Sequence, residues 1–108
     1  MRAAVLCLAL VAGSAQAEFL DGNKLLSDIK GSHGFQMSAL GYVMGVADAI
    51  QNAVACVPPS VTSGQVLDMV RNYLEATPAV RHLTADMIVT HVLKQAFPCA
   101  AKPSGRTL

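Results

Sequence analysis

The sequence lacks an excess of either charge. It holds eight lysines and arginines against seven aspartates and glutamates, a formal net charge of +1 at pH 7. Proteins that bind nucleic acid or anionic membranes electrostatically carry a clustered basic surface. The near-neutral balance gives no indication of such a surface, so we expect no nucleic-acid partner.

Strand patterns are also lacking. No segment alternates between apolar and polar residues over the length of a strand, and runs rich in β-branched and aromatic residues are absent. Because apolar residues recur instead at three- and four-residue steps, the sequence predicts an all-α fold.

Catalytic and metal-binding motifs are missing as well. There is no H-x-x-x-H, no C-x-x-C, no phosphate loop and no nucleophile elbow. We interpret His33, His82 and His91 as ordinary surface or capping residues, and nothing in the sequence pairs Asp48 with Asp86. The sequence therefore predicts a protein that is not an enzyme, with no catalytic residues, no cofactor and no metal.

The first 17 residues have the pattern of a secretory signal peptide. "MRAAVLCLALVAGSAQA" has one charge at Arg2, an apolar run over residues 3–12 and an A-x-A site ending at Ala17. A span needs roughly 20 apolar residues, so the run is too short to cross a bilayer. We predict cleavage after Ala17; the alternative is an uncleaved N-terminal anchor.

Cleavage would leave 91 residues, enough for one small domain over residues 18–99. The two cysteines that remain are Cys56 and Cys99. Exported proteins meet an oxidising compartment, and an even number of cysteines there indicates a disulfide. We therefore predict that Cys56 and Cys99 are bonded.

Helix signals divide this domain into a compact bundle of about four helices with one disulfide. The expected helices cover about 21–29, 35–55, 62–76 and 84–97, with a loop at 77–83 and a disordered tail at 100–108. Asp21, Thr62 and Thr84 are the expected N-caps, and Thr62 forms a capping box with Gln65. The residues expected to face the core are Leu25, Leu26, Ile29, Leu40, Val43, Ala47, Ile50, Val54, Val66, Met69, Val70, Tyr73, Leu74, Ala85, Ile88, Val89, Val92 and Ala96.

The second helix carries a stripe of small residues, Gly41, Gly45 and Ala49, in "GYVMGVADA". Each glycine costs a helix roughly 0.5–1 kcal/mol relative to alanine. We expect this stripe to let another helix cross closely, inside the monomer or in a homodimer; a ligand touching bare backbone is the alternative. Asp48, Gln51 and Asn52 interrupt the apolar character, so the helix is not a membrane span.

Several stretches in order resemble one family. They are "FLDGNKLL" (19–26), "LGYVMGVADA" (40–49), "CVPPSVTSGQVLDMVRNYLEATPAVRHLTADMIV" (56–89) and "LKQAFPC" (93–99). Together they are similar to the Tai family, immunity proteins against type VI secretion amidase effectors, which is related to resistance-associated proteins. The resemblance covers residues 19–99.

The resemblance implies a periplasmic all-α protein, often dimeric, that binds a peptidoglycan amidase and blocks its active-site cleft. Cys56 and Cys99 match the family's disulfide, whereas the second cysteine pair of many members is replaced here by Asp28 and Ala39. That replacement predicts a first helix held by packing alone. The family's motif in the second helix is matched by Gly41, Tyr42, Gly45 and Asp48. Its motif in the loop before the last helix is matched by Pro78, Arg81, His82 and Ala85.

The loop 77–83 is the candidate contact with the partner, through Pro78, Arg81 and His82. In the structural alternative, Arg81 or His82 caps the third helix or pairs with Asp86. The resemblance thus implies a periplasmic immunity protein whose partner is a cognate amidase effector. The alternative function is a solitary periplasmic helical protein without a toxin partner, either a general binding protein or an acid-stress chaperone of the HdeA kind.

Overall fold

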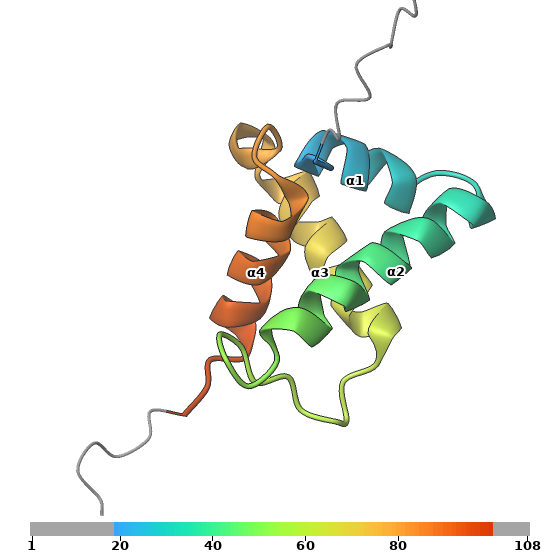
Figure 1. Cartoon of the computed structure of the whole chain (residues 1–108). Coiled ribbons are helices and arrows are strands. Elements are labelled where there is room, and N and C mark those ends of the chain that lie inside the picture. The colour runs from blue at the N-terminus through green and yellow to red at the C-terminus, as the bar shows by residue number, and fades with distance from the viewer. Residues whose placement is uncertain (1–18, 101–108) are drawn as a thin grey trace, which may run out of the picture.

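The computed structural model describes residues 19–100. In these residues the chain forms α1 (Gly22–Ile29), α2 (His33–Ile50), α3 (Ser63–Ala76) and α4 (Ala85–Ala96), with a 3-10 turn at Pro78–Val80 between the last two (Figure 1). No strand is present in this part, so the predicted all-α fold with four helices is confirmed. The predicted signal peptide and all of the predicted tail beyond Ala100 lie outside it.

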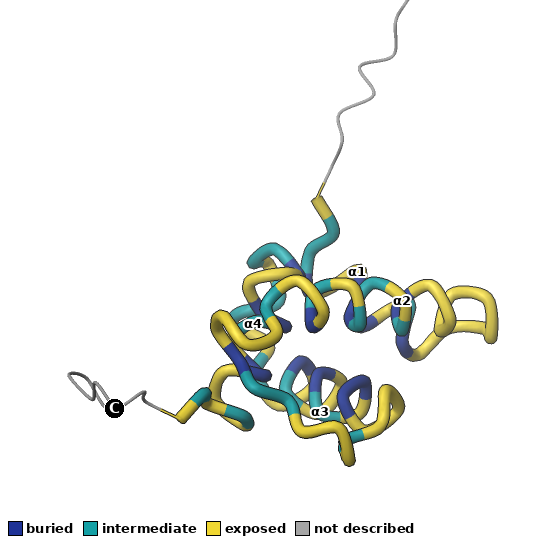
Figure 2. The backbone as a smooth tube through the Cα atoms, turned by 60° about the horizontal axis from the view of Figure 1, so that its bottom comes forward, coloured by how far each residue is buried: buried dark blue, intermediate teal, exposed yellow. Residues whose placement is uncertain are grey.

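Each helix packs against the other three around one core. In Figure 1, α2 and α4 lie in front, α3 lies behind them and α1 lies across one end of the bundle. Figure 2 shows the buried side of α3 turned toward α1 and α2. Sixteen apolar residues are buried, among them Leu25, Val43, Leu74 and Leu93, and no polar or charged residue between 19 and 100 is buried with them. Apolar burial is therefore the main force that holds the helices together.

At two of the three predicted N-caps, the side chain makes the expected capping hydrogen bond. Asp21 accepts a hydrogen bond of 2.8 Å from the amide of Lys24. Thr62 and Gln65 form the reciprocal capping box, with bonds of 3.2 and 2.8 Å. Thr84 is the N-cap of α4, but its side chain makes no capping bond. The first amide of α4, that of Ala85, instead donates to the carbonyl of Leu20 at 2.7 Å.

The prediction for the second helix is wrong at both ends, because α2 begins at His33 and ends at Ile50. The chain leaves the helix at the C-cap Gln51, whose ψ is 131°, and Asn52 follows with a φ of 64°, in the left-handed region. The amide of Asn52 then donates to the carbonyl of Ala55 at 2.9 Å, which closes a tight turn. Val54 therefore leaves the core and is 37% exposed, whereas Ala55 is fully buried.

Smaller corrections concern which side chains reach the core. Ala96 is exposed at the end of α4, and Leu93 is buried in its place. In α3, Leu67 is buried, whereas Met69 and Tyr73 lie at the edge of the core. Leu40 and Ile50 of α2 are likewise only partly buried. These positions border the expected apolar stripes, where small rotations of a helix decide burial.

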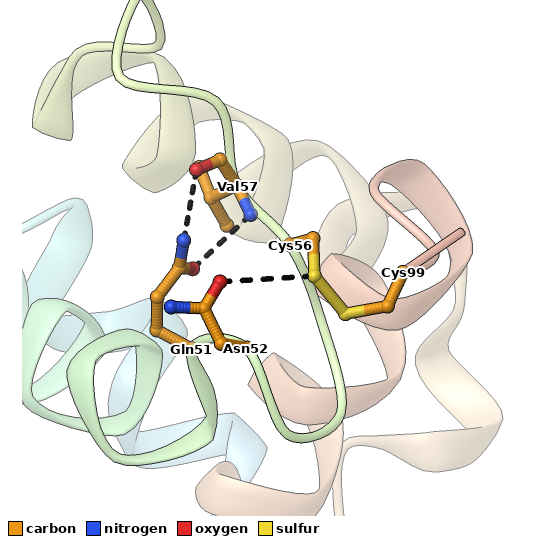
Figure 3. Close-up of a disulfide and its surroundings, with 5 residues drawn as sticks. All are labelled: Gln51, Asn52, Cys56, Val57 and Cys99. Carbon is orange, nitrogen blue, oxygen red and sulfur yellow. Dashed lines mark hydrogen bonds between the residues drawn. A yellow bond between two sulfur atoms is a disulfide. The ribbon is translucent and has the colours of Figure 1, made fainter. Parts of the chain in front are cut away.

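The predicted disulfide between Cys56 and Cys99 is confirmed. It joins the segment after α2 to the segment after α4, with the two Cα atoms 4.8 Å apart (Figure 3). Backbone bonds accompany it: the amide of Cys56 donates to the carbonyl of Phe97 at 2.8 Å, and Ala55 pairs with Pro98 in an antiparallel bridge. The ends of α2 and α4 are thus fixed to each other covalently and through the backbone.

Removing this bond should cost the domain much of its stability. The disulfide spans a sequence separation of 43 residues. In the chain-entropy model such a loop contributes about 4 kcal/mol to the free energy of unfolding. We expect the Cys56→Ala/Cys99→Ala variant to unfold at a clearly lower urea concentration than the oxidised protein. Reduced wild-type protein is the matched control and should resemble the variant; equal midpoints for the variant and the oxidised protein would contradict the prediction.

Candidate protein-binding surfaces

The small-residue stripe of α2 lies on the exposed side of the helix. Gly41, Gly45 and Ala49 are all exposed, and a Cβ atom built on either glycine would meet no other atom within 4 Å. No helix of residues 19–100 crosses α2 here, so the expected crossing inside the monomer is wrong. Crossing in a homodimer remains a prediction.

The glycine that permits a close approach is Gly22, in the first turn of α1. Gly22 is buried, and a Cβ atom there would lie 2.6 Å from Cδ1 of Ile88 and 2.9 Å from the carbonyl oxygen of Arg81. Its amide donates to the carbonyl of Leu83 at 3.0 Å. The sequence reasoning missed this position because a glycine beside an N-cap has no local pattern that distinguishes a packed one from an exposed one.

The loop before α4 is anchored at Arg81. Its Nε donates to the carbonyl of Leu74 at 2.6 Å and its Nη2 donates to the carbonyl of Glu75 at 3.0 Å. These carbonyls belong to the last turn of α3, where no intrahelical donor is available. The structural alternative for Arg81 is thus the one observed. Pro78 and His82, the other two candidate contacts, are exposed.

Two of the hollows on the described surface lie along α2, α3 and α4. The first is a groove of about 530 Å³ between α3 and α4, bordered by the rings of Tyr73 and His91, whose centroids are 5.4 Å apart. The second is a groove of about 290 Å³ between the second half of α2 and the segment 57–61. Asp48 is the one charged residue that lines either groove.

Metal chemistry has no visible basis in this part of the chain. Within residues 19–100, no group of three or more His, Cys, Asp or Glu side chains could hold a metal ion. His33, His82 and His91 are all exposed. No helix among the same residues has the length and apolar character that crossing a membrane requires. The candidate functional features of the described residues are therefore their surfaces.

Comparison with protein families gives one match. The family model of the Rap1a immunity proteins matches residues 21–99, from the N-cap of α1 to the second disulfide cysteine. The chain belongs to the Rap1a immunity protein family. A search of curated proteins finds no match. The matched residues include all four helices, both grooves and the anchored loop, so the whole described fold is that of a Rap1a-family domain.

Asp28 and Ala39 occupy the two positions at which the second cysteine pair was expected. In this Rap1a-family protein, Asp28 forms an ion pair with Lys24 at 2.7 Å, and Ala39 is buried. Lys24 also lies over the ring of Phe35, 5.2 Å from its centroid, and so connects α1 with α2. The amide of Asn23 donates to the carbonyl of Arg81 at 2.9 Å. The expectation that α1 is held by packing alone is therefore wrong.

Tyr42 of the helix motif faces the first turn of α4. Burial raises the pKa of its hydroxyl above the ordinary value of 10.0, and the Asp86 carboxylate raises it further, whereas a hydrogen bond with the Asp86 backbone lowers it. Tyr42 is partly buried at the contact between α2 and α4 and so packs between these two helices.

Alanine substitutions at the two kinds of glycine should have opposite effects. Gly45→Ala should raise the free energy of unfolding by about 0.5–1 kcal/mol, because the methyl group meets open space and alanine favours the helix. Gly22→Ala should lower it by about 1–3 kcal/mol, because the methyl group overlaps Ile88 and a backbone carbonyl. Urea denaturation of dilute protein measures both. A loss of stability in Gly45→Ala would mean that the exposed face is packed after all.

Removing the Arg81 side chain should weaken the junction of α3 with the loop. Arg81→Ala deletes two hydrogen bonds from a charged donor, each worth about 1.5–3 kcal/mol in proteins, so we expect a clear fall in the melting temperature. His82→Ala is the matched control, since His82 is exposed and makes no hydrogen bond with any residue of the described range. Equal melting temperatures for the two variants would show that the Arg81 contacts do not stabilise the fold.

Proposed function

We propose that this protein is an immunity protein that binds and inhibits an effector of a type VI secretion system, and that the effector is a peptidoglycan amidase. The observation that carries the proposal is the match to the Rap1a immunity proteins over residues 21–99. The amidase as target is supported by the ordered motifs that resemble the Tai family, from "FLDGNKLL" to "FPC".

Inhibition by binding fits what the described surface offers. The fold presents grooves and exposed helix faces on a scaffold closed by a disulfide, and such a scaffold loses little conformational entropy when it binds a partner. A stoichiometric inhibitor needs complementarity to its target and no reaction chemistry of its own. One immunity protein would occupy one effector molecule.

The proposed site of action is the periplasm, where peptidoglycan is exposed to an amidase. The signal-peptide pattern of residues 1–17 supports export of the chain. The disulfide between Cys56 and Cys99 supports the same compartment, because disulfides persist where the environment is oxidising.

A protection assay tests this function. A peptidoglycan amidase effector of a type VI secretion system is directed to the periplasm of a bacterial host, with or without this protein, and lysis is followed by optical density. We expect the full-length protein to prevent lysis. A variant lacking residues 2–17 is the matched control; it should remain inside the cell and give no protection.

Calorimetric titration of the two purified proteins completes the test, and we expect a 1:1 complex of submicromolar affinity, near −8 kcal/mol or stronger. Lysis that proceeds unchanged, together with no heat of binding, would contradict the proposal.

A further inference from the structure

The groove beside the second half of α2 combines apolar walls with one carboxylate. Its walls include Met44, Val57, Pro59 and Val61, and Asp48 contributes the charge. The volume of about 290 Å³ is sufficient for one long side chain and too small for a folded element. A hollow of this kind suits a side chain that is apolar along its length and positively charged at its end.

The walls of the groove are fixed before any partner arrives. The side-chain amide of Gln51 holds the backbone of Val57 through two bonds: its Nε2 donates to the carbonyl at 3.0 Å, and its Oε1 accepts from the amide at 3.1 Å (Figure 3). The neighbouring Cys56 is bonded to Cys99. Val57 is held to the end of α2 by these bonds, and the amide of Val61 donates to the carbonyl of Pro58 at 3.0 Å within the segment, so filling the groove would require little ordering of the chain.

Asp48 is free to receive a partner. It is exposed, and it forms no ion pair or hydrogen bond with any residue between 19 and 100. Asp28 and Glu75, by contrast, are paired with Lys24 and with Arg71. An unpaired carboxylate beside an apolar hollow is complementary to the guanidinium of an arginine, which can donate two parallel hydrogen bonds to it.

The approach to Asp48 along α2 is open. Gly41 and Gly45 precede Asp48 by seven and three residues, so all three lie on the same side of the helix. A Cβ atom on either glycine would meet nothing within 4 Å. The backbone of a partner can therefore approach α2 closely next to the groove without displacing any described side chain.

We propose that this groove receives an arginine side chain of the effector, whose guanidinium binds the Asp48 carboxylate while its methylene groups pack against Met44, Val57 and Val61. The inference rests on the proposed function, because it specifies how the effector is recognised. In this proposal the effector approaches the exposed face of α2 that carries Gly41 and Gly45.

Neutralising Asp48 tests the inference. Asp48→Asn removes the charge with almost no change in shape, and Asp68→Asn is the matched control, an exposed aspartate on α3 that does not line the groove. Both variants should keep the wild-type melting temperature. Titration against the amidase should show an affinity at least about tenfold weaker than wild type for Asp48→Asn, and one weaker than that of Asp48→Asn for Asp48→Lys. The affinity of Asp68→Asn should stay within about twofold of wild type. The loss should shrink as salt is added, because salt screens the charge pair in the wild type.

The outcomes separate the inference from the proposed function. If the wild type binds the amidase and Asp48→Asn binds equally well, the groove does not hold a cation of the effector and the inference fails while the function stands. If the wild type binds no amidase, both fail. If sedimentation shows that the wild type is a dimer and Asp48→Asn is a monomer, the groove belongs to self-association and the inference is overturned.

Discussion

The Cys56–Cys99 disulfide is the constraint on which one end of this bundle depends. A domain of this size buries a small core, here sixteen apolar residues within the described range, and small cores supply little net stability. The covalent bond links the irregular segments that follow α2 and α4. The Gln51 contact with Val57 extends this order to the wall of the Asp48 groove. One wall of this candidate recognition surface thus lies next to the disulfide.

The opposite end is held by hydrogen bonds and close packing. Arg81 joins the last turn of α3 to the loop with its side chain and accepts from the amide of Asn23 with its carbonyl. Gly22 allows α1 to lie directly against this loop. The loop that was predicted to contact a partner is therefore also the junction of three helices.

The buried and the exposed sides of α2 differ in composition. Ala39, Val43 and Ala47 are buried and fix the helix in the core. Gly41, Gly45 and Ala49 are exposed, although glycine weakens a helix and nothing in the monomer requires it there. The two glycines lower the stability of the helix and make no contact inside the monomer. A binding partner explains them better than the fold does, which agrees with membership of an immunity protein family.

The local features of this protein could be predicted from its sequence: four helices, the caps at Asp21 and Thr62, and the pairing of Cys56 with Cys99 once the predicted signal peptide is set aside. The helices and caps depend on neighbouring residues, and the disulfide follows because the domain holds two cysteines. Three features needed the folded chain: α2 ends at Ile50, Gly22 rather than Gly45 is packed, and Arg81 turns back onto α3. The packing of Gly22 depends on Arg81 and Ile88, which are far from it in the chain. The end of α2 and the Arg81 bonds depend on the conformation of turns and loops, and helix periodicity carries no information about either.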